Sequence, residues 1–145
     1  MVSGAARFSL RHVEWQRDSA AVRTVREAVF VIEQRVPVSL EWDGVDPQCV
    51  HVLAEIDGIA VGTGRLLPDG HIGRMAVLAQ WRGQGIGAAM LDWLLDIARK
   101  RKMTRIVLHS QSHAIAFYER AGFRIEGEEF MEAGIAHRRM TKTFG

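Results

Sequence analysis

The stretch Arg82-Gly83-Gln84-Gly85-Ile86-Gly87 places three glycines at alternate positions directly before a helix predicted for residues 85–102. Glycine allows the backbone angles and the close approach that let successive N–H groups point at one anion. The N-terminal end of the following helix adds a positive potential. The stretch therefore predicts a phosphate-binding loop, and a tight turn that holds no ligand is the alternative interpretation.

Two common phosphate-binding loops fit this stretch poorly. Gly83-x-Gly85-x-x-Ala88 resembles the dinucleotide fingerprint, but that fingerprint needs an acidic residue at the end of the next strand, which here ends in His109-Ser110-Gln111. Three antiparallel strands also precede the loop where a repeated strand-helix-strand unit is required. A nucleoside-triphosphate loop is excluded, because no Lys followed by Ser or Thr comes directly after the glycines.

Hydrophobic periodicity on both sides of the loop predicts a mixed, mainly antiparallel α/β sheet flanked by helices, in the order β-α-β-β-β-α-β-α-β-β. Asp57-Gly58 is a strong hairpin signal between two of the strands, and Asp18 and Ser19 are expected to cap the first helix. Residues 37–48 form an acidic, turn-rich loop. The predicted strands span 7–13, 50–56, 59–67, 71–77, 105–109, 123–131 and 135–143. Besides the helix at 85–102, two more helices are predicted, one from Asp18 and Ser19 to Gln34 and one over 113–121.

Length and composition favour one globular domain over residues 1–145, with 48% hydrophobic residues and a formal net charge of +2. Such a charge is too mild to indicate nucleic acid as a partner. No apolar run approaches the length of a membrane span, so a cytoplasmic protein is expected. Cys49 is the single cysteine, which excludes an internal disulfide and fits a reducing compartment. The scattered histidines predict no metal site.

Two motifs resemble those of the GCN5-related N-acetyltransferases, the GNAT family. The first is the glycine stretch at residues 82–87, and the second is Ala114-Ile115-Ala116-Phe117-Tyr118 followed by Ala121-Gly122-Phe123. Three further segments are similar to the ElaA/YjcF-like branch of that family: Val29-Phe30-Val31-Ile32-Glu33-Gln34, Glu41-Trp42-Asp43 and Gly134-Ile135-Ala136-His137.

The resemblance implies acetyl-coenzyme A as cosubstrate, without a metal. It also implies a bulge in the fourth strand at Ala76, Val77 and Leu78, where the Val77 N–H would stabilise the negative charge on the thioester oxygen. Gln111 stands where many members have Asn. The implied cofactor-binding residues are Ala76, Val77, Leu78, Arg82, Gly83, Gln84, Gly85, Ile86, Gly87, Ala88, Gln111, Ala114, Phe117 and Tyr118.

The activity that the resemblance implies is direct attack of a primary amine on the thioester. Freeing the lone pair of a lysine-like amine at pH 7 costs about 4 to 5 kcal/mol, so a base or desolvation is required. Tyr118 is the expected general acid. Glu33 is favoured as the base, since its apolar neighbours imply partial burial. The alternatives are a water relay and the side chains of Asp43, Asp46, His51, His71, His109, Glu132 and His137.

The acceptor is expected to be a small-molecule or peptide amine that contacts Glu33, Asp43, Asp46 and His137. The acidic loop at 41–46 suggests a cationic acceptor. Two other interpretations stay open at this point: a coenzyme-A-binding sensor without turnover, and a scaffold with an empty glycine turn. The last two strands could pair between two copies, so a homodimer is one expected state.

Overall fold

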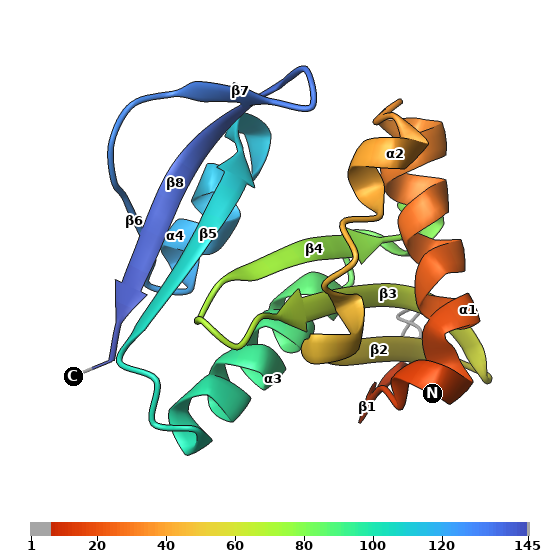
Figure 1. Cartoon of the computed structure of the whole chain (residues 1–145). Helices are drawn as coiled ribbons and strands as arrows, with labels where there is room; N and C mark the ends of the chain where they lie inside the picture. The colour runs from red at the N-terminus through yellow and green to blue at the C-terminus, as the bar shows by residue number, and fades with distance from the viewer. Residues whose placement is uncertain (1–6, 145) are drawn as a thin grey trace.

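The computed structural model describes residues 7–144 and contains two sheets that diverge from each other (Figure 1). Residues 1–6 and 145 of the predicted domain lie outside the described part. The first sheet has the order β1-β2-β3-β4 and is antiparallel throughout. In the second, β8 lies between β5 and β6 and also pairs with β7. The strands are β1 Ser9–His12, β2 Val50–Ile56, β3 Ile59–Leu66, β4 Ile72–Val77, β5 Arg105–Gln111, β6 Arg124–Ile125, β7 Phe130–Glu132 and β8 Ile135–Thr143.

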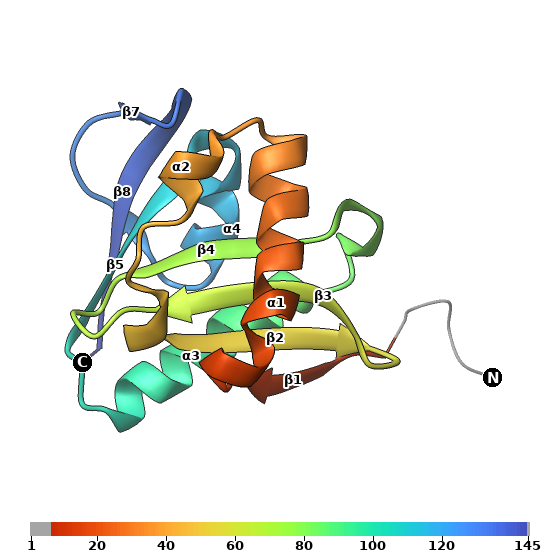
Figure 2. The ribbon, with the colours of Figure 1, turned by 45° about the vertical axis from the view of Figure 1, so that its right-hand side comes forward.

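Helices cover both faces of the first sheet, with α1 on one side and α3 on the other (Figure 2). The alternation of β2 accounts for this arrangement, because Leu53 packs with Val13 and Val22 on one side while Val52 and Ala54 face the α3 side. The helices are α1 Trp15–Arg26, the π-helix η1 Glu27–Glu33 that continues it, α2 Val38–Glu41, η2 Asp46–Gln48, η3 Ala79–Trp81, α3 Ile86–Lys100, η4 Ser112–Ala114 and α4 Ile115–Arg120.

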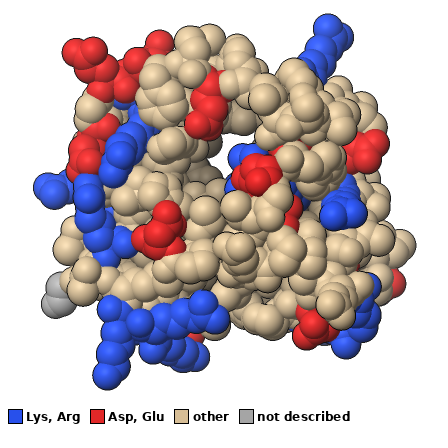
Figure 3. All heavy atoms as spheres, in the orientation of Figure 1, with Lys and Arg blue, Asp and Glu red and all other residues tan. Residues whose placement is uncertain are grey.

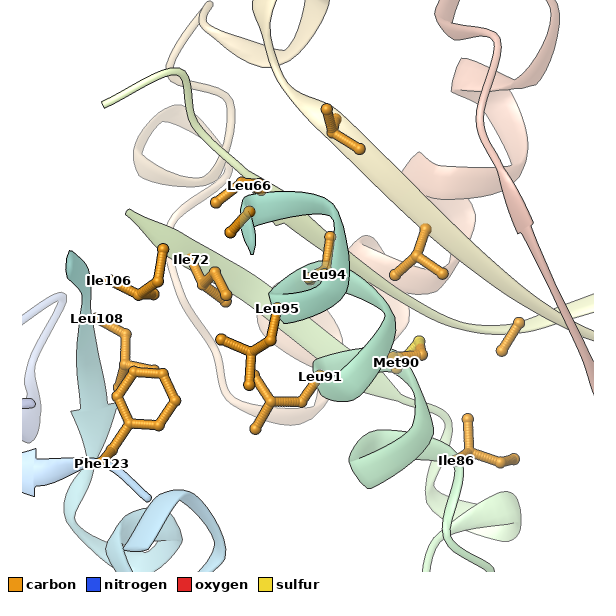
Figure 4. Close-up of a cluster of buried hydrophobic side chains, with 14 of the residues drawn as sticks. Leu66, Ile72, Ile86, Met90, Leu91, Leu94, Leu95, Ile106, Leu108 and Phe123 are labelled. Atoms are coloured by element: carbon orange, nitrogen blue, oxygen red, sulfur yellow. The ribbon is translucent and has the colours of Figure 1, made fainter. Parts of the chain in front are cut away.

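The main core forms around the apolar face of α3. Met90, Leu91 and Leu94 are fully buried or nearly so, and they recur at helical spacing. They pack against the first sheet and also against Ile106 of β5 and Phe123 (Figure 4). The helix that begins at the glycine loop therefore packs against both sheets.

The two sheets touch at one end and separate toward the other. His71 forms an isolated parallel bridge with Val107, whose N–H donates to the carbonyl oxygen of Gly70 at 3.1 Å. Beyond this bridge, no ladder joins β4 to β5 within residues 7–144. The strands diverge instead, which leaves an edge of β4 facing an open space.

The predicted fold class and element order are confirmed, and the bounds of β2 and β8 match their predictions. One predicted strand is wrong: residues 123–131 form two short strands, β6 and β7, with Glu126–Glu129 between them. The first helix also begins earlier than expected. Asp18 does not precede it but lies inside its first turns, where its carboxylate accepts the Glu14 N–H at 2.8 Å.

Candidate active site

A cavity of about 1640 Å³ occupies the space between the diverging sheets. Its walls come from β4, β5, η1, α4 and the start of α3, and its opening is the hollow at the centre of Figure 3. Of the predicted cofactor-binding residues, most line it: Ala76, Val77, Arg82, Gly83, Gly85, Ile86, Gly87, Ala88, Gln111, Ala114, Phe117 and Tyr118. Leu78 and Gln84 are not part of this lining.

The three glycines of the loop differ in what their positions require. Gly83 and Gly85 have φ of +79° and +85°, and a Cβ added at either would meet nothing within 4 Å. The requirement at these two positions is therefore backbone conformation, not space. A Cβ at Gly87 would lie 3.4 Å from the Phe117 ring, which is ordinary van der Waals contact, so packing of α3 against α4 does not require glycine here.

The end of β4 presents a backbone donor to the cavity. Ala76 pairs with Thr63, and the Leu78 N–H donates to the Val61 carbonyl at 2.9 Å. Because hydrogen-bonding direction alternates along an antiparallel strand, the N–H of Val77 points away from β3 and toward the free edge. The N–H of Leu78 is bonded to β3 and is not available to a ligand in the cavity.

The bulge in β4 lies elsewhere than the resemblance implied. Thr63 pairs with Ala76 while Arg65 pairs with Gly73, so β4 has one extra residue between these two pairs. Arg74 has a φ of +50°, in the left-handed region. The bulge therefore falls at Arg74 and Met75, and the bulge expected at Ala76–Leu78 is wrong.

Arg82 and Glu33 bind each other across the cavity mouth. Two parallel hydrogen bonds of 2.6 Å join the guanidinium to the carboxylate, and the Arg82 Nε donates to the Val77 carbonyl at 2.9 Å. The bond from Arg82 holds the pKa of Glu33 below its usual range, which weakens this carboxylate as a base. The expected partial burial is also wrong, because the Glu33 side chain is 41% exposed.

Tyr118 lies at the cavity wall in an aromatic cluster. Its ring contacts Phe117 and Phe123 edge to face, with centroid distances of 5.0 and 5.9 Å. Burial raises the pKa of its phenol to about 12. The hydroxyl therefore keeps its proton near neutral pH.

Imidazoles and one carboxylate gather where the second sheet faces the cavity. His109 Nδ1 lies 3.1 Å from Glu132 Oε1, and His137 stacks on Phe130. The 2.7 Å contact of His137 Nδ1 with the Ile135 carbonyl requires a proton on Nδ1, which leaves Nε2 as the basic nitrogen. His71 also lines the cavity.

The carboxylates of the acidic loop form ion pairs with arginine side chains of the same chain. Buried Arg26 binds Glu41 and Asp46 at 2.7 Å each, and Arg65 binds Asp43 at 2.6 Å and Asp46 at 2.8 Å. The expectation of Asp46 as an acceptor contact is wrong, because it is 4% exposed and does not line the cavity, whereas Asp43 does. These arginine partners were not predicted, and their only sequence signal is the presence of three acids in a short loop.

Two further predicted residues have partners of their own. Gln111 exchanges two hydrogen bonds with Gln34, at 2.8 and 3.1 Å, so this side chain joins β5 to the end of η1. His51 is buried, bonds the Asp46 carbonyl at 2.9 Å, stacks on Trp15 and does not line the cavity. His51 therefore has no access to the cavity as a base.

Comparisons with known proteins agree with this architecture. A family model described as an acetyltransferase (GNAT) domain matches residues 18–144. The chain belongs to the GNAT family. A Bacillus subtilis (strain 168) protein provisionally named as an acetyltransferase is 36% identical to this GNAT chain over 141 residues, which is 93% of this chain and 96% of the relative.

Two relatives belong to the branch that the sequence motifs resemble. YjcF of Bacillus subtilis (strain 168), named an uncharacterized N-acetyltransferase, is 35% identical over 81% of this chain and 87% of its own. The crystal structure of Escherichia coli ElaA is similar with a TM-score of 0.83 and 26% identity, over 94% of this chain and 99% of that one. The predicted family and the prediction of an N-acetyltransferase are thus confirmed.

In the part of the chain that the structure describes, no helix is both long and apolar enough to cross a membrane. The same residues, 7–144, include no group of three or more potential metal-binding side chains of the His, Cys, Asp and Glu types. Cytoplasmic location and a homodimer stay predictions.

Proposed function

We propose that this GNAT protein transfers the acetyl group of acetyl-coenzyme A to a primary amine by direct attack of the amine. The proposal rests on one observation: three kinds of functional group from distant parts of the chain line the same cavity. These are the positive-φ glycines of the loop, the outward N–H of Val77 and the protonated hydroxyl of Tyr118.

The glycine loop fits the phosphate groups of acetyl-coenzyme A. Gly83 and Gly85 leave open space where a Cβ would stand, and the loop leads directly into α3, a helix of 15 residues. Backbone N–H groups at such a helix start bind anions well. Arg82 is better suited to hold η1 against the end of β4 than to bind phosphate, because Glu33 occupies its guanidinium.

The residues beside the reacting atoms have separate tasks. The cosubstrate supplies an activated acetyl thioester. Val77 directs its N–H at the free edge of β4, where it would stabilise negative charge on the thioester oxygen. Tyr118 would donate its proton to the leaving sulfur.

The base remains a prediction with several candidates. Glu33 is the predicted base, but its ion pair with Arg82 lowers its pKa. Nε2 of His137, together with the His109–Glu132 pair, offers a basic group on the opposite wall of the cavity. A water molecule without a dedicated residue is the further alternative.

Amine-dependent release of free thiol tests the proposed function. Purified protein is mixed with acetyl-coenzyme A and a panel of primary amines, and free thiol is followed over time. We expect release that depends on both the amine and the protein. Thermal stabilisation by coenzyme A without thiol release would support the sensor interpretation, and no stabilisation would support the empty scaffold.

A further inference from the structure

Three arginines meet the acidic loop. Two of them make short hydrogen bonds to its carboxylates, although the buried Nε of Arg65 has no hydrogen-bond partner among the described residues. Arg26 donates three hydrogen bonds of 2.7 to 3.1 Å and is buried. Arg65 donates three of 2.6 to 3.1 Å. Burial opposes its charge, but the bonds to Asp43 and Asp46 outweigh that effect and raise the pKa of Arg65.

Arg74 is the third arginine, and its N–H groups make only long hydrogen bonds or none. Its Nη2 reaches the Leu40 and Glu41 carbonyls and Asp43 only at 3.3 to 3.4 Å. Its buried Nε lies 3.3 Å from the Glu41 carboxylate without forming a hydrogen bond. Its Nη1 donates to no residue that the structure describes. Burial lowers the pKa of Arg74, in contrast to Arg65.

The backbone directs this under-used guanidinium into the active-site cavity. Arg74 lies in the β4 bulge with a φ of +50°, a conformation that residues other than Gly, Asn and Asp rarely adopt. It lines the cavity on the same strand as Val77, and its side chain is 26% exposed. Strained residues of this kind cluster at ligand-binding sites.

The charge balance indicates what this wall can bind. Glu41, Asp43 and Asp46 each have a short ion pair with Arg26 or Arg65, so an ammonium group would have to compete with an arginine for them. Arg74 is the third cation beside these three carboxylates and has only long ion pairs, 3.3 Å to Glu41 and 3.4 Å to Asp43. Its weakly bonded donors match an oxyanion, since a guanidinium binds carboxylate through two parallel N–H bonds. This finding disfavours the acidic loop as a receptor for a cationic acceptor.

We infer that Arg74 binds a carboxylate of the acceptor, so that the enzyme acetylates primary amines that also carry a carboxylate. The inference rests on the proposed function. Free amino acids and peptides with a free carboxylate share this chemistry.

The test compares amines that differ only in the carboxylate. Lysine is paired with 1,5-diaminopentane, and a lysine-containing pentapeptide with a free C-terminus is paired with its C-terminal amide. We expect kcat/KM to be about 10- to 100-fold higher for the carboxylate member of at least one pair, as a charge-assisted hydrogen bond would give. The pair that shows the preference identifies the source of the carboxylate.

Two variants assign the preference to Arg74. Arg74→Asn removes the guanidinium while keeping a residue that tolerates the left-handed conformation. We expect it to raise KM for the carboxylate acceptor, abolish the preference and leave turnover of the diamine near the wild-type value. Arg74→Lys keeps the charge but not the planar fork, so we expect an intermediate preference. Arg120→Gln is the matched control, since Arg120 lines the same cavity on α4.

A binding measurement keeps the inference separate from the proposed function. With coenzyme A present, lysine or the free peptide should raise the unfolding midpoint of the wild type, and Arg74→Asn should lose that shift while keeping the shift caused by coenzyme A. Equal kcat/KM within both pairs, or a preference that survives Arg74→Asn, would overturn the inference even if amines are acetylated. If no amine is acetylated, the proposed function fails, and the midpoint shift still decides whether Arg74 binds the carboxylate.

Discussion

At the scale of single residues, Tyr118 combines an apolar environment with a polar function. Its ring packs between Phe117 and Phe123, and burial raises the pKa of its hydroxyl to about 12. A group that donates a proton to a leaving thiolate must be protonated at the working pH. Tyr118 meets this requirement near neutral pH.

Tyr118→Phe removes the hydroxyl and keeps the ring. We expect kcat to fall about 10²- to 10⁴-fold, the range for loss of a general acid. Because the ring contacts remain, thermal stabilisation by coenzyme A should change little. Steady-state kinetics and thermal unfolding with coenzyme A measure the two quantities, and an unchanged kcat would remove Tyr118 from the mechanism.

At the scale of elements, the loop before α3 depends on two residues in the left-handed region. Gly85 caps the helix with φ of +85°. Any other L-residue there is strained by about 1 to 2 kcal/mol, although the surrounding space is open. The conformation of this cap determines where the first N–H groups of α3 point.

Gly85→Ala is therefore expected to lower the free energy of unfolding by about 1 to 2 kcal/mol and to raise KM for acetyl-coenzyme A. Gly127→Ala is the matched control, because Gly127 has φ of +84°, equally open surroundings and a place outside the cavity lining. It should cost similar stability without changing that KM. Chemical denaturation of both variants measures the free energy of unfolding, and steady-state kinetics measures the KM for acetyl-coenzyme A. A similar rise of KM in both would mean that the loop conformation has no specific role.

At the scale of the whole molecule, buried charge joins segments that are distant in the chain. Arg26 at the end of α1 binds Glu41 and Asp46 of the following segment, and Arg65 of β3 also binds Asp46. Burial opposes ionisation of Asp46, but these ion pairs hold its pKa below the usual range. Removing one partner leaves another charge buried without compensation.

Arg26→Ala should lower the free energy of unfolding at pH 7 by about 3 to 5 kcal/mol. Arg23→Ala, one turn earlier on the exposed face of α1, is the matched control. Arg23 lies over the Trp15 and Trp42 rings, and such cation–π contacts at exposed sites are worth about 1 kcal/mol or less. Urea denaturation of the wild type and the two variants measures both losses in the free energy of unfolding. Equal losses would show that the ion pairs contribute no more than surface contacts.

The same cluster predicts how stability depends on pH. The pKa of Asp43 and Asp46 is lowered in the fold, so their contribution is complete above about pH 4 and is lost as pH falls further toward their folded values. Burial lowers the pKa of His51, so a smaller loss begins below about pH 6.5. We expect the unfolding free energy to fall in these two stages between pH 7 and pH 3, and constant stability across this range would contradict the prediction.

Features that arise from neighbouring residues could be predicted from the amino-acid sequence. The periodicity of β2 and β8, the glycine loop and the paired motifs at 82–87 and 114–123 predicted the fold class, the family and a set of cofactor-binding residues of which most line the cavity. The physical reason is that backbone conformation and burial pattern depend mainly on residues a few positions apart.

Only the tertiary structure decided which charged groups meet. Glu33 binds Arg82 across 49 positions, Arg65 binds Asp43 across 22, and the bulge that exposes Arg74 depends on the pairing of β4 with β3. No local pattern encodes such partners, because an ion pair needs two groups within about 4 Å, whatever their separation in the chain. The acidic loop predicted a receptor for cations, whereas in the fold arginines pair with its carboxylates and the weakly bonded guanidinium of Arg74 lines the cavity.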